Sequence, residues 1–189
     1  MRNTLIVAGV ALILVFAAHS AESQDQAKPA AVADYLIGQM HVQTLPETTY
    51  LYGSAKTTLA ELSKAVNTIM PALMEGLAGG KFIQKGPAVF VYQGVMGDQQ
   101  APFDLEVGFP VPDGAKGFDG FKTRKLKAFR CATILVTGST AHFGEAYQKL
   151  FAGIGQAGHR PTGETREAYL YWEGPESPNN VTQIQAGIN

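Results

Sequence analysis

The feature that most constrains the fold of this chain is an approximate internal repeat. The segment Gly86–Gly94 aligns without a gap on Arg166–Gly174, and both copies are rich in β-forming residues. A Gly-Ser pair precedes each copy, Gly53-Ser54 in the first case and Gly138-Ser139 in the second. This repeat predicts two related halves of one domain rather than a solenoid array.

Each half carries the pattern of one strand, one helix and two further strands. In the first half, the capping-box pattern Thr58-x-x-Glu61 begins a helix whose apolar residues recur every three or four positions as far as Leu77. Pro71 is expected to kink or divide this helix. In the second half, Thr140–Gln156 predicts the matching helix.

The strands are predicted from runs of β-branched and aromatic residues bounded by turn signals. They cover Tyr35–Tyr52 with a break at Pro46-Glu47, Pro87–Gln93, Phe103–Val111, Lys125–Thr137, Thr165–Glu173 and Val181–Ile188. We therefore predict an α+β fold in which duplicated β-α-β-β units form an antiparallel sheet, with two helices on one side and a ligand cleft between the halves.

The N-terminus has the pattern of a secretory signal peptide. Arg2 precedes the apolar run Leu5–Ala18, and Ala18-His19-Ser20 fits a small-x-small cleavage site. The run is short for a membrane span, which needs about 20 residues.

We expect a signal peptide over 1–20 and a disordered leader over 21–34. The domain is then expected over 35–189, with halves 35–112 and 122–189. The mature protein would be periplasmic or secreted, without stable membrane insertion; an uncleaved membrane anchor is the alternative.

Composition argues against several classes of function. The formal net charge of −1 leaves no basic footprint for nucleic acid. The single cysteine, Cys131, lies in a strand-like run and is expected to be a buried small hydrophobe. His41, His142 and His159 lie far apart without metal-ligand spacing, so we predict neither a metal nor a cofactor. No nucleophile elbow, phosphate-binding loop or dinucleotide fingerprint is present.

The strand Thr165–Glu173 contains the main candidate for a functional residue. Because side chains alternate between the faces of a strand, Glu167, Tyr169 and Tyr171 are expected to share one face. Ala168, Leu170 and Trp172 would share the other face and suit a hydrophobic core. The first face places a carboxylate beside two aromatic rings. This is a poor core and a candidate binding site.

Two interpretations of Glu167 follow from the residues. It is either a strand glutamate that faces water or pairs with a basic side chain, or a half-buried carboxylate lined by the two tyrosines. Burial without a partner is costly and raises the pKa of a carboxyl group. A cationic ligand would relieve that cost, and the aromatic faces would add cation–π contacts.

The two copies of the repeat differ at this position. Tyr169 and Tyr171 align with Val89 and Val91, so one half offers aromatic rings where the other offers an apolar wall. We therefore expect Val89 and Val91 to line the site across from Glu167.

Several short motifs together resemble the effector-binding domain family, also called gyrase-inhibitor-like. They are Phe103–Val111, Gly144–Leu150, Glu167–Leu170 and Thr182–Ile184, and their order spans about 36–189. The resemblance implies two β-α-β-β units side by side with a cleft for small, often lipophilic or cationic molecules. It also implies that the acidic pocket residue and its aromatic neighbour are Glu167 and Tyr169.

The chain departs from the family pattern in two ways. Gln183 and Gly187 replace a glutamate and a proline of the usual closing strand, which would shape the cleft differently. A signal-peptide pattern also precedes the domain, where the regulators of the family carry DNA-binding helices.

We therefore predict an exported protein that binds lipophilic or cationic aromatic molecules and is not an enzyme. The predicted ligand-binding residues are Glu167, Tyr169, Tyr171, Val89, Val91 and Phe109. Three alternatives remain. They are a hydrolase of reactive small molecules that uses Glu167 as general acid or base, a protein-interaction module, and a haem-binding protein.

Overall fold

A computed structural model of the protein describes residues 34–95 and 97–189. The predicted signal peptide, 1–20, and all of the predicted leader except Asp34 lie outside the described residues. The elements in chain order are β1 (Leu36–Ile37), β2 (His41–Leu45), β3 (Thr48–Thr57), α1 (Leu62–Ala78), β4 (Ala88–Gln93), β5 (Phe103–Val111), β6 (Lys122–Leu126), β7 (Phe129–Thr137), α2 (Phe143–Gln156), β8 (Pro161–Tyr171) and β9 (Val181–Ile188). In this part of the chain, no helix combines the length and apolarity needed to cross a membrane.

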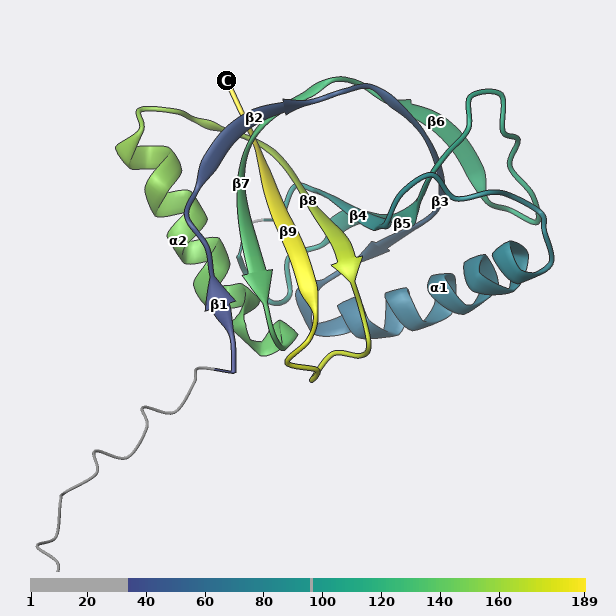
Figure 1. Ribbon diagram of the computed structural model, residues 1–189, viewed down its shortest axis with the longest axis horizontal. Helices are drawn as coiled ribbons and strands as arrows, with labels where there is room; N and C mark the ends of the chain where they lie inside the picture. Colours follow the sequence, from purple (N-terminus) through teal and green to yellow (C-terminus); the bar gives the residue numbers. More distant parts are fainter. Residues whose placement is uncertain (1–33, 96) are drawn as a thin grey trace, which may run out of the picture. The chain divides into compact units, whose positions relative to one another are not determined.

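The described residues form one curled antiparallel sheet of nine strands (Figure 1). The strand order is β1-β7-β9-β8-β4-β5-β3-β6, and β2 pairs with β7 beyond this path. Each half of the repeat supplies one strand, one helix and a pair of neighbouring strands in the same order, β3-α1-β4-β5 and β7-α2-β8-β9. The predicted α+β class and the duplicated unit are confirmed.

Both helices cover the same face of this sheet, as predicted. In the first half, Ile69 and Leu73 of α1 pack in one cluster with Val107 of β5. In the second half, Leu150 of α2 packs in another cluster with Ile184 of β9. Registers between the strands, given below, place these side chains on one continuous face, which we call the helix face. In Figure 1 the helices lie along the outside of the curled sheet.

The opposite side of the sheet, which we call the inner face, has an apolar cluster of its own. Its buried members are Tyr50, Val89, Val91, Leu126 and Ala168. The strands at the centre of the sheet are therefore covered on both faces.

The two halves exchange strands at their beginnings. β2 belongs to the first half by sequence but pairs with β7, and β6 opens the second half but pairs with β3. The predicted single strand Lys125–Thr137 is in fact two strands, β6 and β7, with a break at Lys127-Ala128. The sequence divisions 35–112 and 122–189 are therefore not separate packing units.

Helix α1 begins as its sequence predicts. The side chain of Thr58 accepts a hydrogen bond from the backbone N–H of Glu61, 3.3 Å away, and caps the short 3-10 turn Leu59–Glu61 that leads into the helix. Pro71 does not divide α1, which runs unbroken through it. The division expected at Pro71 is thus not observed, and the packing of Ile69 and Leu73 on β5 holds the helix together across the proline.

Candidate functional site

Glu167 lies in the middle of the sheet, on the helix face. In the register of the strands it pairs with Ile184 of β9 on one side and with Phe90 of β4 on the other. Paired residues of antiparallel strands present their side chains on the same face. The row continues to Ile134 of β7 and Val107 of β5. Glu167 is therefore a carboxylate in a row of otherwise apolar side chains, at the strand pair β4–β8 where the two halves meet.

Three tyrosine hydroxyls donate hydrogen bonds to this carboxylate among the described residues. The Oη atoms of Tyr92 and Tyr169 each lie 2.6 Å from Oε2, and the Oη atom of Tyr147 lies 2.9 Å from Oε1. These residues come from β4, β8 and α2, so both halves of the molecule contribute. We call Glu167 with these three tyrosines the tyrosine-carboxylate cluster.

The cluster is enclosed by protein. The exposed fraction of Glu167 is 5 %, and that of Tyr92 is 4 %. Tyr147 and Tyr169 are half-buried. The predicted interpretation of Glu167 as a strand residue facing water is therefore wrong.

Burial raises the pKa of Glu167, and the hydrogen bonds from Tyr169, Tyr92 and Tyr147 oppose this shift without cancelling it. Burial and the nearby carboxylate also raise the pKa of each of the three phenols well above the usual range. The phenols therefore remain hydrogen-bond donors. In the described part of the chain, no basic side chain forms an ion pair with Glu167.

Arg166, the neighbour of Glu167 in sequence, cannot neutralise it. Its side chain points to the inner face, where it pairs with Gln185 of β9 and Val91 of β4 in the strand register. There its Nη2 atom lies 2.5 Å from Oε1 of Glu164, and its guanidinium carbon lies 3.8 Å from the ring centroid of Phe129. The pleat of the strand thus separates two adjacent buried charges.

A β-bulge at the end of β8 changes the predicted faces. Tyr169 pairs with Thr182, but Tyr171 pairs with Val181, so β8 contains one extra residue, Leu170, at this point. An extra residue reverses the alternation of side chains beyond it. Tyr171 therefore lies on the opposite face from Glu167, and the expectation that it lines the site is wrong.

The same bulge brings Trp172 to the helix face. Its ring meets the ring of Tyr169 edge-on, with centroids 5.1 Å apart. Leu170 and Trp172 were expected to be core residues, but they are 49 % and 44 % exposed. Of the predicted core face only Ala168 is buried.

Of the other predicted site residues, Val89 and Val91 do not face Glu167. Val89 pairs with Ala168, and Val91 pairs with Arg166, so both valines lie on the inner face. Phe109 is on the helix face but packs beneath α1 against Phe82, with ring centroids 5.9 Å apart. The structure therefore brings together only Glu167 and Tyr169 of the predicted set.

The residues that face Glu167 across the strand pair are Phe90 and Tyr92. The ring of Phe90 packs against Tyr169 at a centroid distance of 4.6 Å. The sequence alignment of the two copies did not predict these two residues. The copies pair as antiparallel strands, so residues at aligned positions are not neighbours in the sheet. The alternation of Phe90 and Tyr92 in β4 was the available signal. Tyr147 was visible only as part of the apolar stripe of α2.

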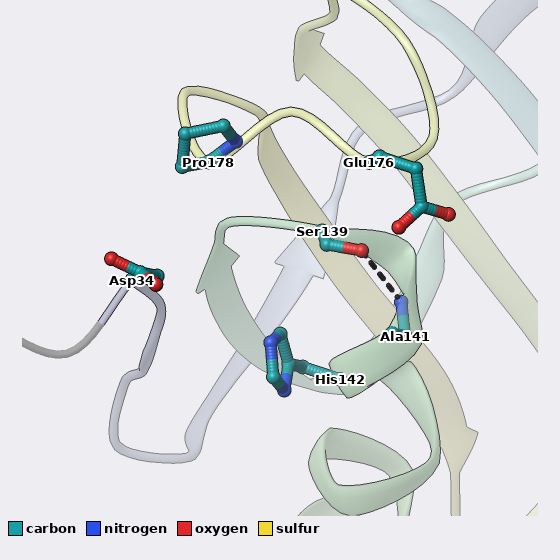
Figure 2. A pocket seen from close by; sticks show the side chains of 6 residues that line it. All are labelled: Asp34, Ser139, Ala141, His142, Glu176 and Pro178. Carbon is teal, nitrogen blue, oxygen red and sulfur yellow. Dashed lines mark hydrogen bonds between the residues drawn. The ribbon is translucent and has the colours of Figure 1, made fainter.

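A separate hollow of about 430 Å³ lies beside the beginning of α2 (Figure 2). It is lined by Asp34, Ser139, Ala141, His142, Glu176 and Pro178, and it shares no residue with the tyrosine-carboxylate cluster. The hydroxyl of Ser139 accepts a hydrogen bond from the N–H of Ala141, 3.2 Å away. The His142 ring stacks on Tyr35 at a centroid distance of 3.6 Å. The side chains of Ser139 and His142 are thus already engaged in local interactions, a hydrogen bond and a ring stack.

Within residues 34–95 and 97–189, no three His, Cys, Asp or Glu side chains gather as metal ligands. Cys131 is buried, and burial raises its pKa to about 11, as expected for a thiol in a core. The predicted absence of a metal or cofactor stays a prediction.

Comparisons with solved structures show the fold. The C-terminal domain of EcmrR matches with a TM-score of 0.66 at 20% identity, over 80% of this chain and 97% of that domain. SAV2435 bound to tetraphenylphosphonium matches with a TM-score of 0.60 at 10% identity, over 80% of this chain and 94% of that one. A hydrolase from Listeria innocua matches with a TM-score of 0.53 at 13% identity, over 80% of this chain and 92% of that one.

The longer EcmrR chain, in a complex with DNA, matches with a TM-score of 0.66 at 20% identity and over 84% of this chain. Our chain spans 59% of the length of that relative. A search among curated proteins gives no match.

A comparison with family models is more specific, because one model matches residues 38–188, nearly the whole described domain. This match, together with the duplicated fold, shows that the chain belongs to the family of GyrI-like small-molecule binding domains.

Proposed function

We propose that this domain binds lipophilic, cationic aromatic molecules at the tyrosine-carboxylate cluster. The observation that carries the proposal is a buried carboxylate, Glu167, that has hydrogen-bond donors but no counter-charge among the described residues. A charge held in this way is costly without an opposite charge, and a cationic ligand would supply it.

The surroundings of Glu167 favour an aromatic ligand. Four aromatic rings, those of Phe90, Tyr92, Tyr147 and Tyr169, adjoin the carboxylate. Aromatic faces attract cations by about 0.5–2 kcal/mol each. A hydrogen bond to a charged group contributes about 1.5–3 kcal/mol. A large organic cation is weakly hydrated and can contact the carboxylate and several rings at once, so it fits the site better than a small inorganic cation.

Two further observations support the proposal. The similar structure of SAV2435 was solved with tetraphenylphosphonium, which is a lipophilic aromatic cation. The cluster also lies at the junction of the two halves, on strands β4 and β8, where the resemblance implied a binding cleft.

We further propose that the protein acts outside the cytoplasm, in the periplasm or as a secreted protein. The support is the signal-peptide pattern of Arg2 and Leu5–Ala18. With a net charge of −1, nucleic acid is not a proposed partner. Mass spectrometry of exported protein tests this, and retention of Met1–Ser20 in a membrane fraction would contradict it.

The ligand is tested with a matched pair of probes, the permanent cation N-methylacridinium and its uncharged analogue acridine, in mildly alkaline buffer. Isothermal titration calorimetry should show that Glu167→Gln weakens the cation by about 1.5–3 kcal/mol and leaves acridine nearly unaffected. Glu75→Gln removes an exposed carboxylate of α1 and is the control for net charge; it should change neither affinity. If Glu167→Gln weakens both probes equally, or neither, Glu167 does not select charge.

The second candidate is hydrolysis of reactive small molecules. It is favoured by the raised pKa of Glu167, because a general acid or base works best when its pKa is closer to neutral than that of an ordinary carboxyl group. Purified protein should show no turnover of epoxides or other strained electrophiles above buffer. Turnover that disappears in Glu167→Gln would replace the binding proposal with the hydrolase.

A further inference from the structure

Trp172 has an unusual combination of exposure and order. It is the single tryptophan of the chain, and it is 44 % exposed just beyond the end of β8. The next residue, Glu173, donates its backbone N–H to Oδ1 of Asn180, 2.9 Å away. Asn180 is fully buried, and its Nδ2 atom donates to the carbonyl of Gly174. The backbone that carries the indole is therefore fixed although the ring itself meets solvent.

The ring of Tyr169 is held between two aromatic neighbours. Phe90 contacts it at 4.6 Å and Trp172 at 5.1 Å, both measured between ring centroids. Phe90 is buried in the core beneath α1, so it leaves no room for a guest. Trp172 is the exposed neighbour, and Tyr169 in turn donates its hydroxyl hydrogen to Glu167. A continuous aromatic path thus leads from solvent through Trp172 and Tyr169 to the buried carboxylate.

We infer that Trp172 is a ligand-contacting residue, the outer aromatic wall of the Glu167 site, on which the rings of an aromatic cation stack. This inference rests on the proposed function. An ordered, exposed indole is the best aromatic surface for a cation, and ordering it costs the complex little because its backbone is already fixed. The bulge at Leu170 places the Trp172 ring on the same face of the sheet as Glu167, which gives this irregularity a role in the inferred ligand contact.

The experiment compares two exposed aromatic residues that are adjacent in sequence but lie on opposite faces. Trp172→Leu removes the proposed wall, and Tyr171→Leu removes an aromatic ring of similar exposure, 52 %, from the other face. By calorimetry, Trp172→Leu should weaken N-methylacridinium about tenfold. Tyr171→Leu should leave the affinity within a factor of about two.

A spectroscopic signature separates contact from a merely structural effect. Stacking on an indole shifts the long-wavelength absorption of bound N-methylacridinium to the red, and this shift should be present in wild type and in Tyr171→Leu. It should be absent in Trp172→Leu under conditions where calorimetry shows the site to be saturated. Trp172→Phe should restore most of the affinity but not the red shift.

The outcomes distinguish the inference from the proposed function. If Glu167→Gln selectively weakens the cation but Trp172→Leu binds like wild type without spectral change, the function stands and the wall is refuted. If Tyr171→Leu has the larger effect, the side chains alternate without a bulge and the inference is wrong. If wild type binds no aromatic cation at all, both ideas fail.

Discussion

Arg166 and Glu167 are adjacent residues with opposite charges, and the protein treats them differently. Arg166 on the inner face is 6 % exposed and has a counter-charge in the carboxylate of Glu164, with the ring of Phe129 against its guanidinium. Glu167 on the helix face is 5 % exposed and receives hydrogen bonds from neutral phenols alone within the described residues. The first charge is satisfied internally, whereas the proposed function assigns the second to a cationic ligand.

The comparison separates two reasons for burying a charge. A buried ion pair with good geometry belongs to the architecture, and breaking it is expensive. A buried charge held only by neutral dipoles keeps part of its desolvation cost and gains from any cation that reaches it. Matched glutamate-to-glutamine substitutions on β8, at Glu164 and at Glu167, should therefore have opposite consequences.

The largest effect is expected for Glu164→Gln. This change leaves the guanidinium of Arg166 buried without a counter-charge, and the free energy of unfolding should fall by roughly 3 kcal/mol. Urea denaturation measures the loss. Glu106→Gln is the control, because its partner Arg124 is far more exposed, and it should cost less than about 1 kcal/mol. Equal losses in the two variants would show that Arg166 does not depend on Glu164.

Glu167→Gln should stabilise the protein, by up to about 2 kcal/mol at a pH above the raised pKa of Glu167. Because the folded state raises the pKa of Glu167, the wild-type carboxyl group favours folding when protonated. That contribution is present below the ordinary glutamate pKa of about 4.3 and is lost as the pH rises through the raised value. The stability difference between the variant and wild type should therefore grow with pH over this window and then level off. A variant that is less stable than wild type above this window would contradict the idea of an unpaired buried charge.

Tyr92→Phe should reduce the free energy of unfolding by about 1 kcal/mol, since it removes one hydrogen bond to the carboxylate. It should also raise the pKa of Glu167 further, because the lost bond favours the charged form. Tyr50→Phe is the matched control on the inner face, where the Tyr50 hydroxyl donates to the carbonyl of Val89 over 2.6 Å. Both variants should lose similar stability in urea denaturation, but only Tyr92→Phe should shift the pH dependence of cation binding.

The smallest effect is expected for Thr182→Val. The Oγ1 atom of Thr182 is buried, has no hydrogen-bond partner among the described residues, and lies across from Tyr169 on β9. Replacing the hydroxyl by a methyl group should be neutral or stabilising by up to about 1 kcal/mol. Cation affinity should not change. A clear loss of affinity would show that this hydroxyl contacts the ligand.

The sequence predicted the architecture well, because the repeat and the two apolar helix stripes are strong signals. The same alternation that placed Glu167 beside Tyr169 failed two residues later at Tyr171. A single extra residue in β8 reverses every face beyond it, and the run Leu170-Tyr171-Trp172 contains no Gly or Pro to announce a bulge. Which residues lie opposite Glu167 depends on the register of β4 against β8. This register is a long-range property, and aligning the two copies of the repeat does not reveal it.

The exchange of β2 and β6 between the halves was also invisible in the sequence. Both strands are short, and each pairs with a strand that is far away along the chain. Pro46-Glu47 and Lys127-Ala128 mark breaks between strands, but neither pair indicates that the chain crosses from one half of the sheet to the other.

The central claim is that the charge on Glu167 is reserved for a cationic ligand. Its most direct test is the affinity for the permanent cation N-methylacridinium as a function of pH, in wild type and in Glu167→Gln. We predict that wild-type affinity falls as the pH drops through the raised pKa of Glu167, with a midpoint above the ordinary glutamate pKa of about 4.3. The variant should bind weakly with no such transition. A wild-type affinity that is independent of pH over this range, or the same transition in Glu167→Gln, would contradict the claim.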